Sequence, residues 1–201
     1  MTPSTPTTGP QIADPLADLP TPTPTGTAYA TDPNVGSDTT LYPGIYNAGL
    51  TVTAGTATFT PGEYYINGGT LAFKNNATVL GDGVFFYAYN NANLVIANNT
   101  TTVTMSAPTS GTYRGIWYFQ DRADTKDAVV SGGAVTNISG TIYISNPSSK
   151  LTYSGGSSSG SLAQYTIFVV WQFIIGGGGT FHNDFSGLGG SPLPGGVALS
   201  E

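Results

Sequence analysis

The densest group of charged side chains lies between Asp121 and Asp127, where three aspartates, Asp121, Asp124 and Asp127, recur at every third residue. Arg122 and Lys126 stand between them. Several carboxylate oxygens on one loop could bind a hard cation, and a carboxylate beside a basic side chain could abstract a proton from an acidic polysaccharide. We favour a solvated loop with locally paired charges, because no Gly-containing calcium-loop spacing is present. The sequence therefore favours no metal site, and these three aspartates are its weak candidates.

The single histidine, His182, precedes Asn183 and Asp184. A histidine near an aspartate and several serines could belong to a hydrolase triad, but the chain contains no Gly-x-Ser-x-Gly motif. It also contains no cysteine and no second imidazole, so thiolate or paired-histidine metal ligands are excluded. We therefore expect no catalytic residue and no cofactor, and we expect His182 to be a hydrogen-bonded surface residue.

Threonines in Thr-x-Thr pairs are a third candidate for chemistry. They are similar to the flat threonine arrays of ice-binding solenoids, although their spacing along the chain does not repeat from one expected coil to the next. An exposed β-face rich in threonine is the ordinary explanation. The pairs are Thr51/Thr53, Thr58/Thr60 and Thr102/Thr104.

The composition indicates the class of fold that positions these residues. The chain has 201 residues, 28 of them glycine, with 39% hydrophobic and only 8% charged residues. That composition suits one all-β domain and supplies few of the residues that build surface helices. A net charge of −6 with five basic residues argues against nucleic-acid binding. No apolar run reaches the roughly 18 residues of a membrane span.

One short pattern occurs twice, because Leu41-Tyr42-Pro43-Gly44-Ile45-Tyr46 returns as Phe59-Thr60-Pro61-Gly62-Glu63-Tyr64. A strand-plus-turn unit at a fixed period is typical of a β-solenoid, whose coils must stack to bury their apolar sides. We predict a single-stranded right-handed parallel β-helix with short irregular coils. Pro43-Gly44 and Pro61-Gly62 suit type II turns. The strands expected in the first coils are 50–53, 56–60, 64–67, 70–73, 77–80, 84–89, 93–97 and 101–105.

A Pro/Thr-rich segment, residues 1–40, precedes the predicted solenoid domain, residues 41–201. Its proline runs favour an extended conformation. Ile12, Leu16 and Leu19 leave two interpretations open: a flexible tail, or a segment that clips onto the flank of the solenoid. We expect it to pack partly on the solenoid.

Three strands are apolar on both faces, at residues 84–89, 116–119 and 167–175. A solenoid strand buries one face, so the other face needs a cover. Residues 1–40, residues 192–199 or another protein could provide it, and we favour the chain itself. The candidate interface residues are Phe85, Tyr87, Trp117, Phe119, Phe168, Val170 and Ile174.

Several short motifs occur in an order shared with one family. They include Asp14–Pro20, the two Pro-Gly-x-Tyr turns, Ser106–Gly111, Phe119–Arg122, Gly140–Tyr143, Leu151–Gly155 and Asn183–Ser186. From Asp14 onward the chain resembles the C-terminal domain of TadG-like proteins of the bacterial tight-adherence (Flp) pilus-assembly system. The resemblance implies an envelope or surface structural role, an N-terminal membrane segment absent from this chain, and no catalytic residues. The relatives usually have a cysteine near Gly26-Thr27 and another where this chain has Asn47, so their disulfide does not carry over.

The function that follows is a non-enzymatic extracellular or cell-surface structural protein in pilus assembly, adhesion or fibre formation. Its partners would be other proteins or further copies, bound through apolar strips and coil ends. One alternative is a glycan-binding or polysaccharide-degrading β-helix that uses the aromatic residues near Asp121. A second is an ice-binding solenoid. We expect the protein to be exported, with its targeting segment missing from this chain.

Overall fold

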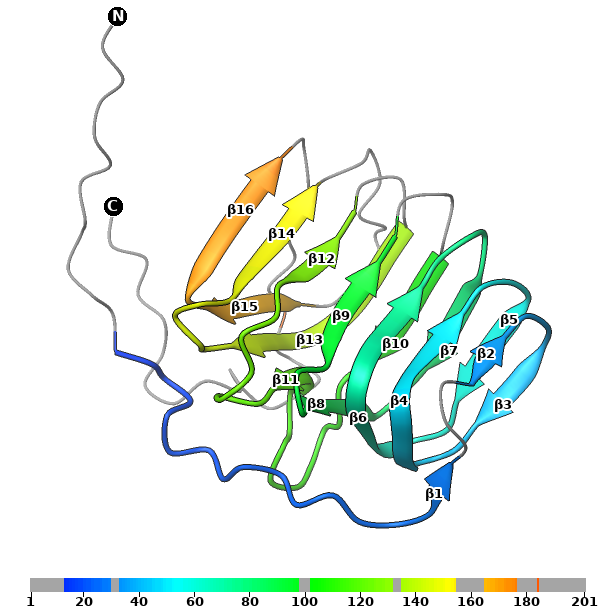
Figure 1. The fold of residues 1–201 in the computed structure, drawn as a ribbon, viewed down its shortest axis with the longest axis horizontal. Coiled ribbons are helices and arrows are strands. Elements are labelled where there is room, and N and C mark those ends of the chain that lie inside the picture. Colours follow the sequence, from blue (N-terminus) through cyan, green and yellow to red (C-terminus); the bar gives the residue numbers. More distant parts are fainter. Residues whose placement is uncertain are drawn as a thin grey trace, which may run out of the picture.

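The chain forms a parallel β-solenoid (Figure 1), seen here in a computed structural model that describes residues 13–29, 33–97, 102–131, 135–154, 165–176 and 184. The described residues contain no helix, and hence none that could span a membrane. All strand pairs are parallel and join neighbouring coils. The all-β solenoid predicted from the sequence is therefore confirmed.

Each complete coil passes through three faces, which we call the first, second and third face. The first face contains β1 (Ala28–Tyr29), the first halves of β4 (Gly44–Val52) and β6 (Gly62–Phe73), β8 (Val84–Tyr89), β11 (Ile116–Gln120), the second half of β13 (Val135–Ile144) and β15 (Thr166–Val170). The second face contains β2 (Asn34–Val35), the second halves of β4 and β6, β9 (Asn93–Ile96), β12 (Ala128–Val130), β14 (Lys150–Ser154) and β16 (Gln172–Gly176). The third face contains β3 (Thr39–Leu41), β5 (Thr56–Phe59), β7 (Thr78–Gly81), β10 (Thr102–Ser106) and the first half of β13.

The interior is built from side chains that alternate along each strand and stack from coil to coil. On the second face Leu50 pairs in register with Leu71, and Leu71 with Leu94. All three are fully buried. The same row continues through Leu151, which is also buried, to Phe173 in the last strand. The core is therefore a column that runs the length of the stack.

The coils lengthen as far as the one that contains the 107–115 loop and are shorter after it, where Lys150 pairs with Gln172, 22 residues later. Thr56 and Asp38, hydrogen-bonded across the first coil boundary of the third face, are 18 residues apart. Ser106 and Asp82 are 24 apart, and Tyr87 and Asp121 are 34 apart. The eighteen-residue spacing that revealed the solenoid therefore describes only its first coil, and the largest increase comes from the loop at residues 107–115 between β10 and β11.

The two Pro-Gly turns differ from the prediction. Gly44 and Gly62 have φ angles of 148° and 141°, whereas the glycine of a type II turn has a φ near about 80°. Both glycines are the first residues of long strands, β4 and β6. Glycine is nevertheless required at position 44, because a Cβ there would lie 2.4 Å from the backbone oxygen of Thr27.

The solenoid begins before the predicted boundary at residue 41. β1, β2 and β3 lie between residues 28 and 41 and pair with β4 and β5. Residues 14–21, which we call the strap, lie outside the coils, and in Figure 1 this part of the blue segment follows the underside of the stack. Leu16 and Leu19 of the strap pack on the first face, whereas Ile12 falls outside the described residues. Of the two interpretations, the described part fits the clipped segment.

Candidate functional site

The outer side of the first face carries a row of aromatic side chains, which we call the aromatic ladder: Tyr65, Tyr87, Phe119 and Tyr143. They are register neighbours in four successive coils. Their ring centroids are 6.4, 5.5 and 4.7 Å apart in that order. The strands that are apolar on both faces are recognisable in the sequence, but the alignment of these four residues is not, because the offset between coils changes.

The strap and the 107–115 loop cover this ladder. Leu16 is buried against it, and Leu19 packs beside it. Tyr113, from the loop, stacks on Phe85 with ring centroids 4.4 Å apart. The Tyr113 hydroxyl also donates to the backbone oxygen of Pro20 at 3.3 Å, which joins the loop to the strap.

Arg122 fastens the strap. Its Nη2 donates to the backbone oxygens of Leu16 at 2.9 Å and Leu19 at 2.8 Å. Its Nη1 donates to the Thr21 hydroxyl at 3.2 Å, and its Nε to the Tyr143 hydroxyl at 3.0 Å. Charge-assisted hydrogen bonds are stronger than neutral ones, so one guanidinium holds three positions of the strap. We call this set of contacts the Arg122 latch.

A second contact ties the strap to the ladder. The Tyr143 hydroxyl donates to Asp14 Oδ2 at 2.6 Å, and Asp14 Oδ1 accepts from the backbone nitrogen of Leu16 at 2.9 Å. The Arg122 guanidinium also lies 5.1 Å from the Phe119 ring centroid and 5.4 Å from that of Tyr143, within cation–π range. Burial and then the hydrogen bond to Asp14 raise the pKa of Tyr143. The neutral phenol is therefore the form that the strap requires.

The three aspartates of the charged loop make separate structural contacts. Asp121 accepts hydrogen bonds from the Tyr87 hydroxyl and, at 2.8 Å, from the backbone nitrogen of Ala123. Burial and then the Asp121 hydrogen bond raise the pKa of Tyr87. Asp127 forms an ion pair with Lys150 at 3.1 Å. Lys150 lies outside the charged loop, so this ion pair is not the pairing within a solvated loop that was favoured from the sequence.

Asp124 is the buried member of the set, with 4% of its surface exposed. Its Oδ1 accepts from the backbone nitrogen of Asn91 at 2.7 Å, and its Oδ2 has no hydrogen-bond partner. Burial raises the pKa of this carboxyl. Its backbone oxygen accepts from Ser149 Oγ at 3.1 Å, so the residue joins the corners of three coils. In the part of the chain that the structure describes, no three Asp, Glu or His side chains gather as a metal site would require.

Four of the seven candidate interface residues are buried within the chain: Phe85, Tyr87, Trp117 and Phe119. Phe85, Tyr87 and Phe119 lie under the cover of the ladder, while Trp117 packs edge-on against Phe86 in the core, 5.5 Å between centroids. Phe85, Tyr87 and Phe119 cannot contact a partner while their cover is in place, and Trp117 is enclosed by the core itself. The interface assignment is therefore corrected for them, because the chain covers its own apolar surplus.

The other three candidates lie near the end of the stack. Phe168 and Val170 of β15 are half-buried against the core, while Ile174 of β16 is 49% exposed. Around Ile174 lie other exposed apolar side chains, and we call residues 171–175 the terminal edge. Its members Trp171, Phe173 and Ile175 are 50%, 39% and 54% exposed.

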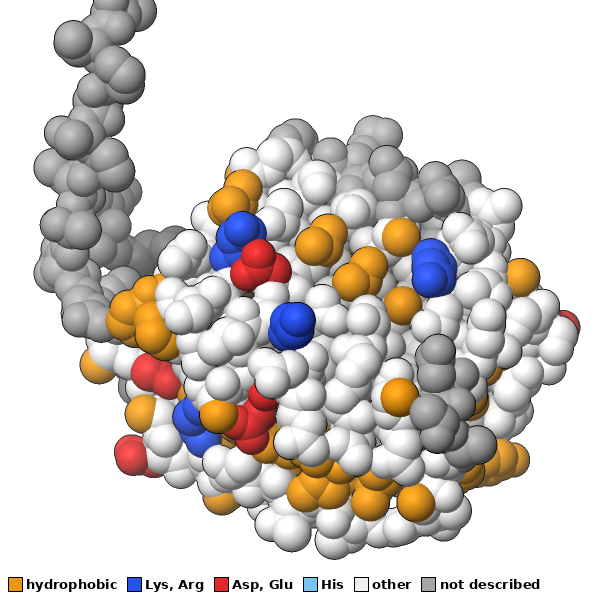
Figure 2. Space-filling view, viewed as in Figure 1, with side chains coloured by type: hydrophobic (Ala, Val, Ile, Leu, Met, Phe, Trp, Pro, Cys, Tyr) orange, Lys and Arg blue, Asp and Glu red, His pale blue; other side chains and the backbone are white. Residues whose placement is uncertain are grey.

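The terminal edge is open on one side. Within the described residues β16 pairs only with β14, and β15 only with β13 (Figure 1). Figure 2 looks onto the second face, where isolated hydrophobic side chains are spread among polar ones. The register places Val95, Val129, Thr152 and Ile174 in one outward row across this face. Ile174 is the last and most exposed position of that row.

On the third face, threonines from successive coils are register neighbours, an alignment that was not predicted from the sequence. Thr56, Thr78 and Thr102 form one outward row, and Thr40, Thr58, Leu80 and Thr104 form the next. The Thr-x-Thr pair does not recur in successive coils, as expected, because Leu80 takes the second position in the coil between Thr58 and Thr104. The single row Thr56, Thr78 and Thr102 was not recognised from the sequence, because the offset between these coils is not constant.

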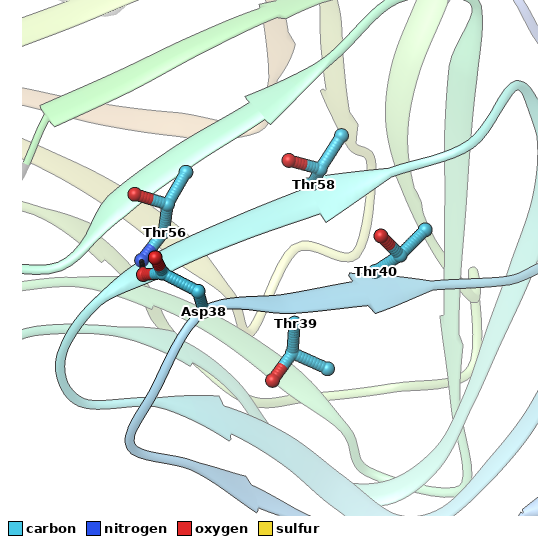
Figure 3. A pocket seen from close by; sticks show the side chains of 5 residues that line it. All are labelled: Asp38, Thr39, Thr40, Thr56 and Thr58. Atoms are coloured by element: carbon cyan, nitrogen blue, oxygen red, sulfur yellow. Dashed lines mark hydrogen bonds between the residues drawn. The ribbon is translucent and has the colours of Figure 1, made fainter.

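At the first coil this face has a shallow open hollow of about 400 Å³, lined by Asp38, Thr39, Thr40, Thr56 and Thr58 (Figure 3). Asp38 Oδ1 accepts from the backbone nitrogen of Thr56 at 2.8 Å. In Figure 3 Thr40, Thr56 and Thr58 point to one side of the strands, and Thr39 points to the other. His182 lies outside the described residues, and its neighbour Asp184 is exposed.

No family model, no curated protein and no solved structure matches this chain.

Proposed function

We propose that this protein is a non-enzymatic structural protein of the cell surface that works through protein contacts, in pilus assembly, adhesion or a fibre. The observation that carries the proposal is the terminal edge. It is the one large apolar surface that the described part of the chain leaves uncovered, at the end of a solenoid whose aromatic ladder is fully covered.

The chemistry of the terminal edge supports a protein partner. Natural edge strands are protected by charged side chains, proline or short length, because an open edge pairs with other chains. Residues 165–176 contain no charged residue and no proline, and β16 is five residues long. Large exposed apolar patches mark interaction surfaces. An edge with these properties favours association with another chain.

The location comes from the resemblance to TadG-like C-terminal domains, which implies a role at the envelope or surface. The composition supports it, with few charged residues and a net charge of −6. The strap also supports the resemblance. Most of the segment that Arg122 holds is one of the motifs shared with that family, Asp14-Pro15-Leu16-Ala17-Asp18-Leu19-Pro20.

The proposal is tested in the source cells with the double variant Phe173→Asp and Ile175→Asp. We expect the variant to be exported as the wild type is, and the surface assemblies seen by electron microscopy to be lost. Tyr42→Asp is the matched control, because Tyr42 is 55% exposed at the opposite end of the stack. Normal assemblies in the double variant, or a wild-type protein that cell fractionation finds only in the cytoplasm, would contradict the proposal.

Ice binding is the second candidate function, because the third face carries one aligned row of three threonines beside a second row that is interrupted by Leu80. Neighbouring strands place the side chains of a row about 4.8 Å apart, which gives a regular array of hydroxyl and methyl groups. The candidate predicts thermal hysteresis that Thr78→Tyr reduces and Thr152→Tyr, on the second face, does not. Absence of hysteresis in the wild-type protein eliminates it.

A further inference from the structure

The two ends of the stack differ in strand length and polarity. At the first end β1 and β2 have two residues each and β3 has three. The hollow beside β3 is lined by threonines and Asp38. At the last end β15 and β16 have five residues each, and the exposed side chains are mostly apolar. The apolar last end of one copy is therefore poorly complementary to the polar first end of another copy.

We propose that the terminal edge binds the terminal edge of a second copy of this chain, related by a two-fold axis. This inference rests on the proposed function, since it names the partner at the same edge. A two-fold axis between two last coils makes β16 antiparallel to the partner's β16. Such an interface is closed and self-complementary, and the product is a dimer with its two first ends outermost.

The register of this pairing follows from the length of β16. Full pairing of residues 172–176 places Ile174 on the axis, opposite the partner's Ile174. Phe173 then faces the partner's Ile175, and Gln172 faces the partner's Gly176. Aromatic and β-branched side chains across an antiparallel pair stabilise each other by roughly 0.2–1 kcal/mol.

The interior column supplies a second reason. Phe173 continues the buried row of Leu151, and Ile175 continues the position of Tyr153. Both side chains thus stand on the core side of the second face, yet they are 39% and 54% exposed. A partner edge that repeats the same row would extend the core of each copy across the axis.

Head-to-tail stacking would require the five-residue β16 to pair with the two-residue β2. Three residues of β16 would keep unpaired backbone groups, and the apolar edge would meet a two-residue strand, Asn34–Val35, in which Asn34 is exposed. Stacks that do not close also grow into filaments. The asymmetry of the ends therefore favours a closed dimer.

The experiment uses single cysteines in the 201-residue chain, which has no cysteine of its own. Residues opposite each other in an antiparallel pair have Cα atoms about 4.5–5.5 Å apart, within the range of a disulfide. Ile174→Cys is therefore expected to form a disulfide-linked dimer on mild oxidation, at a rate at least tenfold that of Phe173→Cys. Tyr42→Cys is the exposed control and should stay uncrosslinked. Light scattering should give a dimer for the wild type and for Tyr42→Lys, and a monomer for Ile174→Lys.

Three results would overturn the inference. A wild-type monomer at every concentration would show that another part of the chain, such as residues 177–201, or a different protein covers the edge. A series of growing oligomers would show head-to-tail stacking. Equal cross-linking of Tyr42→Cys and Ile174→Cys would show random collision. The two proposals can be told apart. If the protein is a monomer in solution but its surface assemblies still depend on Phe173 and Ile175, only the self-pairing is refuted and the proposed function stands.

Discussion

The aromatic ladder and the terminal edge are both apolar outer surfaces of the same solenoid, and they differ in what covers them. Over the ladder, Leu16 and the Arg122 latch hold a segment of the chain in place. At the terminal edge the side chains are 39–54% exposed. The comparison shows that a strand that is apolar on both faces indicates only that a cover is needed. Contacts far apart in the sequence decide whether the cover is internal.

The same truncation on the two surfaces gives the largest contrast. Leu16→Ala removes a buried side chain of the strap that covers the ladder and should lower the free energy of unfolding by about 2–5 kcal/mol. Ile174→Ala should change it by no more than about 0.5 kcal/mol in dilute solution, because that side chain is already half-exposed. Urea denaturation monitored by circular dichroism measures both. Equal effects would show that the ladder and the edge are covered alike.

Loss of the Arg122 latch should have the next largest effect. Arg122→Ala removes the bonds to Leu16, Leu19 and the Tyr143 hydroxyl, and should cost about 2 kcal/mol. Hydrogen exchange of the strap amides should become faster, while the core strands keep their protection. Lys126→Ala, an exposed residue of the same charged loop, is the control and should be neutral. Unchanged exchange in the strap of Arg122→Ala would contradict the latch.

A smaller effect is expected from pH. Burial and then the hydrogen bond to Glu63 raise the pKa of Tyr65, a member of the ladder, from 10.0 to about 12. A raised pKa means that the stabilising contribution is complete below about pH 10 and is lost as the pH rises through about 12. The free energy of unfolding should therefore fall over this window, and less steeply in Tyr65→Phe. The same slope in both proteins would show that the Tyr65 phenol is not covered.

The sequence predicted those features that depend on local pattern. The repeated motif at Pro43 and Pro61 predicted the solenoid fold, because one strand and its turn recur in the next coil. The threonine row and the ladder were missed, because the offset between coils is not constant and ranges from 18 to 34 residues among these hydrogen-bonded pairs. The latch was missed for another reason: Arg122 lies 106 residues from Leu16, and no periodicity links them. The exposed terminal edge was anticipated only in Ile174, since its neighbours have the same pattern as buried strands.

The chain carries two tryptophans: Trp117 is fully buried in the interior core and serves as the internal reference, and Trp171 is 50% exposed at the terminal edge. Acrylamide quenching of Trp117→Phe and Trp171→Phe, measured across a dilution series, tests the central claim most directly, because each variant reports on one tryptophan. We predict that Trp117 is protected at every concentration, and that Trp171 is strongly quenched in dilute protein and becomes protected as copies associate. A Trp171 that is shielded at all dilutions would show that the chain covers both surfaces itself, and would contradict the open terminal edge.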